Sequence, residues 1–208
     1  MKKSYLALGL LLSVAGTAQA QQTRIGLKAG LSLATITGNG SDELGNLVGF
    51  NGGLMVDVPT SEMFSFHPEF LYSQRGTSST SIVPYGNGAT RDVISRFHYI
   101  DVPLLLRIKA KGLFFEVGPQ VGILVTRKTE VTYNEPNQGS YTQSGYGIGG
   151  ARKIDVGYVL GLGYQLPQGL EFGVRYNGGL LDVSDSSRSS KSYHSVFQFQ
   201  VGYLFGGK

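Results

Sequence analysis

The chain has 208 residues, with 18 basic and 14 acidic residues, no cysteine, no tryptophan, and many glycine, tyrosine and phenylalanine residues. The absence of cysteine excludes disulfide bonds and thiolate metal ligands. Two of the 18 basic residues, Lys2 and Lys3, lie in the N-terminal leader, so the rest of the chain is almost neutral. It has no basic cluster, and nucleic acid is therefore not an expected partner.

The first 20 residues have the features of a signal peptide. A lysine pair is followed by the apolar run Tyr5–Val14 and by small residues around Gln19, in the sequence Ala-Gln-Ala. The apolar run is shorter than the roughly 20 residues that a membrane-spanning helix needs. We predict that residues 1–20 are a cleaved signal peptide and that residues 21–208 form one domain.

Eight segments of this domain alternate between apolar and polar residues, as strands with one apolar face do. Each is as long as, or longer than, the roughly 9–11 residues with which a tilted strand crosses a bilayer. No segment has a sustained 3.6-residue apolar period, so no helix is expected after the leader. The segments are Thr23–Ile36, Leu47–Pro59, Phe64–Thr77, Phe97–Lys109, Leu113–Val131, Arg152–Gln165, Leu170–Leu181 and Ser192–Phe205.

The clearest alternation lies in the sequence HYIDVPLLLRIKA, residues 98–110. Its even positions from Ile100 to Ile108 are all apolar, whereas Asp101 and Arg107 lie on the opposite face. The apolar face of such a strand packs against lipid in a membrane barrel, or against a core in a soluble protein.

The connections between the segments distinguish these two cases because they alternate in length. Transmembrane barrels have short periplasmic turns and longer outer loops, and an even strand number puts both termini on the periplasmic side. We predict an all-β fold, an eight-stranded antiparallel up-and-down transmembrane β-barrel in the outer membrane of a Gram-negative cell. The alternative is a soluble lipocalin-like barrel with its apolar face around a ligand cavity. The short connections are Thr60–Met63, Ala110–Gly112 and Leu166–Gly169, and the long ones are Thr37–Asn46, Ser78–Arg96, Thr132–Ala151 and Asp182–Lys191.

Ten charged residues fall on the polar faces that would line the barrel interior. Opposite charges are able to pair there, whereas arginine in the middle of the lipid face costs about 2–4 kcal/mol. Eight strands leave an interior just wide enough for side chains to fill, so we predict a plugged interior, with a narrow porin-like solute channel as the alternative. The ten residues are Lys28, Asp57, Glu69, Arg75, Asp101, Arg107, Glu116, Asp155, Glu171 and Arg175.

Six stretches, in this order, resemble the outer-membrane β-barrel domain family of Bacteroidetes-type bacteria, whose members are often labelled porin family or PorT-like. The resemblance covers almost all of residues 21–208 and implies an eight-stranded outer-membrane barrel, and it implies no known activity. The stretches are FSFHPEFLYSQRG (64–76), YIDVPLLL (99–106), EVGPQVG (116–122), DVGYVLGLGYQL (155–166), VRYNGGLLDV (174–183) and the terminal VGYLF (201–205).

The sequence GYGIGG, Gly145–Gly150, formally matches a dinucleotide-binding pattern. That pattern requires a strand before it and a helix after it. Here it lies in a loop rich in Tyr, Ser and Gly and leads into a strand, so we interpret it as a loop.

The three histidines, His67, His98 and His194, match no metal-binding spacing. Ser192 and His194 share one face near the predicted outer rim, and Asp182 and Asp185 are close in sequence. A histidine that activates a serine would give a lipid-modifying outer-membrane enzyme, which is the second alternative function.

The long connections are rich in Tyr, Ser, Gly and Asn, which form adaptable contact surfaces. We predict a monomeric protein without catalysis, cofactor or metal, with a structural role or a docking or adhesion role through extracellular loops. Its expected partners are outer-membrane lipid and the outer-membrane assembly machinery. An extracellular or secretion-complex protein is a further hypothetical partner.

Overall fold

The computed structural model describes residues 23–38, 45–83, 88–136, 139–183 and 191–206. Its nine strands are β1 (Arg24–Gly38), β2 (Gly45–Pro59), β3 (Phe64–Ile82), β4 (Thr90–Ala110), β5 (Leu113–Glu135), β6 (Gly139–Tyr146), β7 (Ile154–Gln165), β8 (Leu170–Gly179) and β9 (Ser192–Leu204). The predicted signal peptide lies outside the described residues. No helix in the described segments is long and apolar enough to cross a membrane.

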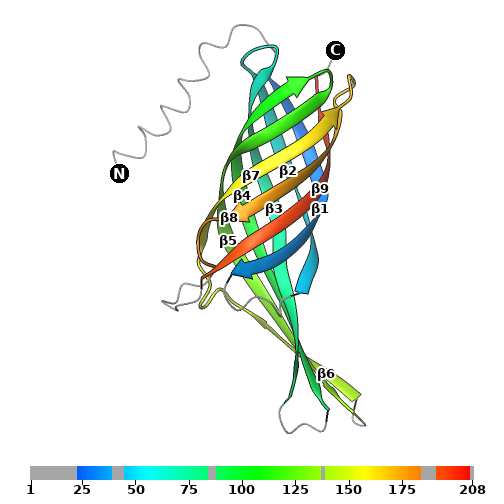
Figure 1. Cartoon of the computed structure of the whole chain (residues 1–208), viewed down its shortest axis with the longest axis vertical. Helices are drawn as coiled ribbons and strands as arrows, with labels where there is room; N and C mark the ends of the chain where they lie inside the picture. The colour runs from blue at the N-terminus through cyan, green and yellow to red at the C-terminus, as the bar shows by residue number, and fades with distance from the viewer. Residues whose placement is uncertain (1–22, 39–44, 84–87, 137–138, 184–190, 207–208) are drawn as a thin grey trace, which may run out of the picture.

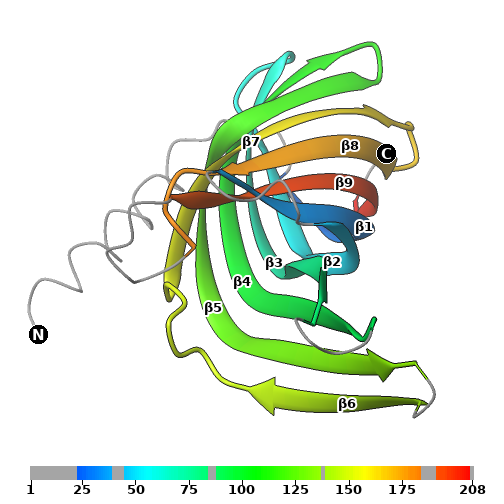
Figure 2. The ribbon, with the colours of Figure 1, turned by 60° about the horizontal axis from the view of Figure 1, so that its bottom comes forward.

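Eight of these strands form a closed antiparallel ring (Figures 1 and 2). The order is β4-β3-β2-β1-β9-β8-β7-β5, and pairing between β4 and β5 closes it. The first and last strands pair side by side, with Leu31 opposite Phe199. β6 pairs only with β5 and stays outside the ring. The predicted eight-stranded up-and-down barrel is therefore confirmed.

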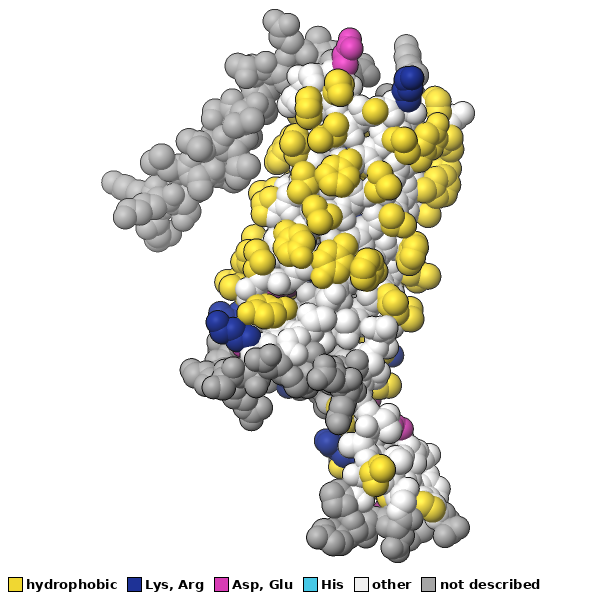
Figure 3. Space-filling view, viewed as in Figure 1, with side chains coloured by type: hydrophobic (Ala, Val, Ile, Leu, Met, Phe, Trp, Pro, Cys, Tyr) yellow, Lys and Arg dark blue, Asp and Glu magenta, His cyan; other side chains and the backbone are white. Residues whose placement is uncertain are grey.

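The apolar face of the strands points outward. Leu31 and Phe199 are 61% and 63% exposed. On the opposite face of the same two strands, Lys28, Gln198 and Gln200 are buried inside the barrel. In β4, Leu104 is exposed and Leu105 is buried, which is the alternation that the sequence predicts. Figure 3 shows a band of apolar side chains across the face of the barrel wall that is in view. Such a band is the surface that a barrel presents to lipid.

The short connections lie at the end of the barrel where β9 ends. At one of them, Lys111 and Gly112 both have positive φ, 48° and 88°. A two-residue turn of this kind has a twist that matches the two strands it joins, β4 and β5. Its tightness keeps this end of the barrel compact.

At the opposite end, the structure differs from two loops expected from the sequence. β3 continues to Ile82, β4 begins at Thr90, β5 continues to Glu135, and β6 forms within the expected loop 132–151. We call residues 79–82, 90–96, 128–135 and 139–146 the strand extension. It projects beyond the barrel, away from the end that holds the C-terminus (Figure 1). These residues have no buried face, so they lack the apolar alternation by which strands are recognised in a sequence.

Candidate functional site

A network of six charged side chains occupies the middle of the barrel interior. Five strands contribute them, and each side chain is at most 5% exposed as a residue. Equal numbers of positive and negative groups meet there, so the network is neutral as a whole. Its cations are Lys28, Arg107 and Arg175, and its anions are Glu69, Glu116 and Glu171.

The two arginines of the network each bridge two carboxylates. Arg175 donates from Nη1 to Glu69, at 2.7 Å, and from Nη2 to Glu116, also at 2.7 Å. Arg107 donates from Nη2 to Glu116 at 2.5 Å and from Nη1 to Glu171 at 2.8 Å. These groups lie on β3, β4, β5 and β8, and all of the ion pairs except Arg107–Glu116 connect strands that are not consecutive in the sequence.

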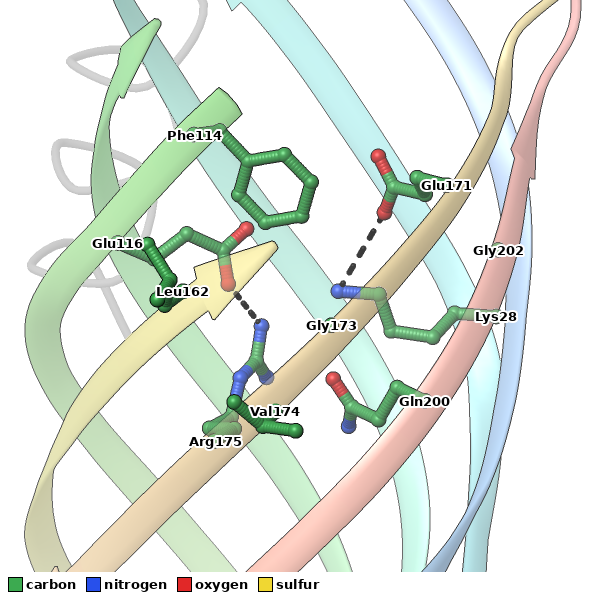
Figure 4. Close-up of a pocket in the computed structure, with 10 residues that line it drawn as sticks. All are labelled: Lys28, Phe114, Glu116, Leu162, Glu171, Gly173, Val174, Arg175, Gln200 and Gly202. Atoms are coloured by element: carbon green, nitrogen blue, oxygen red, sulfur yellow. Dashed lines mark hydrogen bonds and ion pairs between the residues drawn. The ribbon is translucent and has the colours of Figure 1, made fainter. Parts of the chain in front are cut away.

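The third cation, Lys28 on β1, completes the network. Its Nζ donates to Oε1 of Glu69 at 2.7 Å and lies 3.7 Å from Oε1 of Glu171. Figure 4 shows the Lys28–Glu171 and Arg175–Glu116 pairs around a small cavity. The cavity has a volume of about 10 Å³, which is room for about one water molecule.

A second charged cluster lies nearer the strand extension. Arg75 on β3 pairs with Asp101 at 2.7 Å and with Asp155 at 2.5 Å. Ser73 donates a hydrogen bond to Asp101, and the Arg75 guanidinium lies 4.6 Å from the centre of the Tyr99 ring. This arginine is therefore enclosed by two carboxylates and one aromatic ring.

A third cluster lies near the short turns. Asp57 on β2 accepts hydrogen bonds from Arg24 at 2.9 Å and from Lys109 at 2.6 Å, and its Oδ1 lies 3.5 Å from Nδ1 of His67. Arg24 and Lys109 are absent from the predicted set because they lie at strand ends. Their positions nevertheless continue the alternation of β1 and β4, and that signal would have identified them.

All ten predicted interior charges are at most 7% exposed and are distributed over these three clusters. Neutral amides fill the space between the central network and the Arg75 cluster, where Gln200 donates to Asn51 at 2.9 Å and to Gln198 at 3.0 Å. Beyond them, the apolar side chains of Phe97, Tyr99 and Leu124 pack together.

One group of side chains has the geometry of a metal site. The ligand atoms of His67, Glu69 and Glu116 lie within 4.8 Å of one another. Arg107, however, lies 3.0 Å from His67 Nε2 and hydrogen-bonds Glu116, and Arg175 binds both glutamates. A cation would have to displace these guanidinium groups, so this arrangement suits ion pairs better than a metal ion.

The structure describes three of the four residues of the hypothetical serine–histidine catalytic group, namely Ser192, His194 and Asp182. His194 is 2% exposed, and its Nε2 lies 3.3 Å from the Tyr99 hydroxyl. The Ser192 backbone N–H donates to Asp182 at 3.4 Å. No hydrogen bond between Ser192 and His194 is present among the described residues, and Asp185 lies outside them. The geometry therefore gives no support to serine activation by His194.

The strand extension is held together by cross-strand side-chain contacts. Tyr133 and Tyr141 stack with ring centres 5.0 Å apart, and the hydroxyls of Thr132 and Thr142 lie 2.9 Å apart. Lys128 pairs with Glu130 on the same strand at 2.7 Å, and this bond lowers the pKa of the Glu130 carboxyl. All eight residues of β6 are exposed. Gly145 and Tyr146, the start of the GYGIGG pattern, belong to β6 and correct the loop expected there; Gly147–Gly150 follow the strand, and no helix comes after them.

The chain is similar to two solved structures, at low sequence identity. Ail, the attachment invasion locus protein of Yersinia pestis, crystallised with the heparin analogue sucrose octasulfate, is 13% identical with a TM-score of 0.46. Neisserial surface protein A is 11% identical with a TM-score of 0.50. Each comparison covers 89% of this chain and 100% of the other. No curated protein matches the sequence.

A family model matches most of the chain. It is described as the outer membrane protein beta-barrel domain, and it matches residues 18–185. This range includes seven of the eight ring strands, and β9 closes the ring next to β1. The outward apolar band and the buried charges agree with such a domain. The chain therefore belongs to the outer membrane protein β-barrel domain family and is an outer-membrane protein.

Proposed function

We propose that this protein is a non-enzymatic outer-membrane barrel with a plugged interior, and that it docks a partner outside the cell through its strand extension. The observation that carries the docking role is the extension itself. It continues the ring strands β3, β4 and β5 beyond the barrel, adds β6, and exposes Tyr141 and Tyr146 to 49% and 73%. A barrel that only spans the membrane has no need of such a structure.

The plugged interior is supported by the three charged clusters. Ion pairs between strands that are not neighbours in the ring cross the interior at the central network and at the Arg75 cluster, and the cavity beside the central network has room for about one water molecule. Removing one partner of a buried ion pair leaves an uncompensated charge, so the pairs resist separation. An ion would have to break them to pass, and we therefore favour a plug over a solute channel.

The orientation of the barrel follows from the lengths of its connections. The end with the short turns faces the periplasm, and the strand extension lies outside the cell. This orientation agrees with cleavage of a signal peptide after residue 20 and with insertion by the outer-membrane assembly machinery.

We further propose that the protein is a monomer of the Bacteroidetes-type, PorT-like branch of the family, on the strength of the six stretches named above. Lipid surrounds it, and its docking partner is an extracellular or secretion-complex protein.

Site-specific photocrosslinking in intact cells tests the docking role. We expect a photoreactive amino acid at Tyr141 or Tyr146 to form covalent adducts with another protein, because these side chains project from the extension into the medium. The matched control is Phe199, which is similarly exposed, at 63%, but lies on the lipid-facing wall. Adducts are read as mass shifts on denaturing gels. Absence of protein adducts at both tyrosines would refute the docking role.

A further inference from the structure

We propose that the free edge of β6 binds an extended segment of a partner protein as an additional strand of the sheet. This inference rests on the proposed docking function and specifies how docking occurs. Among the residues that the structure describes, β6 pairs with β5 on one side and with no strand on the other. An unpaired sheet edge presents a row of backbone donors and acceptors to another chain.

The hydrogen-bonding pattern identifies which groups of β6 face outward. The Gly147 N–H donates to the Arg127 carbonyl at 3.0 Å, and these residues continue the register in which Lys128 faces Tyr146. In an antiparallel pair, hydrogen-bonded positions alternate with positions whose groups point away from the partner. The N–H and C=O groups that point to the free edge therefore belong to alternate residues, namely Ser140, Thr142, Ser144 and Tyr146.

This edge lacks the features that prevent edge pairing in other proteins. Lysine, other charges, proline and bulges usually protect exposed edges. The β6 sequence GSYTQSGY contains no charged residue and no proline, and its pairing with β5 has no shift in register. Tyr141, stacked on Tyr133, lies at the edge as an apolar contact for an added strand. A segment with aromatic or β-branched residues fits this edge.

A second copy of the chain fits the edge less well within one membrane. β6 runs along the part of β5 that leaves the barrel, so it follows the direction of the extension (Figures 1 and 2). Antiparallel pairing of β6 with β6 of another copy would turn the second barrel to the opposite end of the joint sheet. Two barrels in the same membrane point in the same direction, so a second copy would have to pair in parallel, which is less stable per residue. We therefore identify the occupant as an extended segment of a different protein.

A proline at an outward-facing position tests this inference on the full-length barrel in detergent micelles. Ser144→Pro removes one N–H from the free edge and, because that N–H faces away from β5, leaves the β5–β6 bonds in place. Ser144→Ala is the matched control and keeps the N–H. The probe is a synthetic peptide KTEVTYNE, the sequence of residues 128–135, which β6 already accepts as a neighbour in β5. Binding is followed by amide chemical shifts of β6.

In the wild type, we expect saturable amide shifts at Thr142 and Ser144 at peptide concentrations up to the millimolar range. In Ser144→Ala, we expect the same saturable shift at Thr142. Ser144→Pro should weaken binding at least tenfold, and a peptide N-methylated on alternate residues should not bind. Equal binding by Ser144→Pro, no saturable binding by the wild type, or self-association through β6 in place of peptide binding would overturn the inference. If the Tyr141 adducts in cells persist in Ser144→Pro, the docking function stands and the edge mechanism fails.

Discussion

Replacing Arg107 by alanine is expected to lower the free energy of unfolding by about 3–5 kcal/mol, because it leaves buried carboxylates without a partner. Arg107 is fully buried and pairs with Glu116 and Glu171. Glu116 keeps its bond to Arg175, but Glu171 is left with only the 3.7 Å contact to Lys28. Urea unfolding of the barrel in lipid vesicles measures the loss.

The matched control is Arg24→Ala. The Arg24 side chain is 21% exposed, and its partner Asp57 keeps a second cation, Lys109. Partly exposed pairs contribute about 0–1 kcal/mol, so the control should remain close to the wild type. If both variants lose the same free energy of unfolding, the buried central network stabilises the barrel no more than the partly exposed Arg24 pair does.

Placing arginine at Leu104 is the second substitution with a large expected effect. Leu104 lies on the outward face of β4 and is 44% exposed. Arginine near the middle of the lipid face costs about 2–4 kcal/mol in transmembrane barrels. The same urea unfolding in vesicles should show a loss of this size.

Ile82 offers a matched control for the lipid face. It is 76% exposed but lies in the strand extension, beyond the barrel. Ile82→Arg should change the free energy of unfolding by less than about 0.5 kcal/mol, as surface substitutions usually do. An equal penalty at the two positions would show that the face of Leu104 is not in contact with lipid.

The sequence predicts the ring of the barrel because lipid and interior impose opposite requirements on alternate residues. Leu104 and Leu105 show the limit of this pattern, since both are leucines and only their neighbours indicate which of them points outward. Alternation also places Glu69 and Glu116 inside. Their common partner Arg175 could not be inferred, because the meeting of β3, β5 and β8 depends on the register of pairing around the whole ring.

The strand extension was missed for a different reason. Its residues are solvated on both faces, and the sequence of β6 therefore resembles a polar loop. Cross-strand contacts stabilise these strands, such as the stack of Tyr133 on Tyr141. These two residues lie eight positions apart in the sequence, on β5 and β6. Single-residue properties do not contain this information, so the proposed docking surface became visible only in the structure.

Planar-bilayer recording is the measurement that tests the closed barrel most directly. The purified protein is first shown to be folded by its faster migration in unboiled than in boiled samples on denaturing gels. We predict that the inserted barrel gives no current steps at any voltage, because Arg107, Arg175 and Arg75 each pair with a carboxylate on a non-neighbouring strand across the interior. Reproducible current steps from the folded protein would contradict the plug and establish a solute channel.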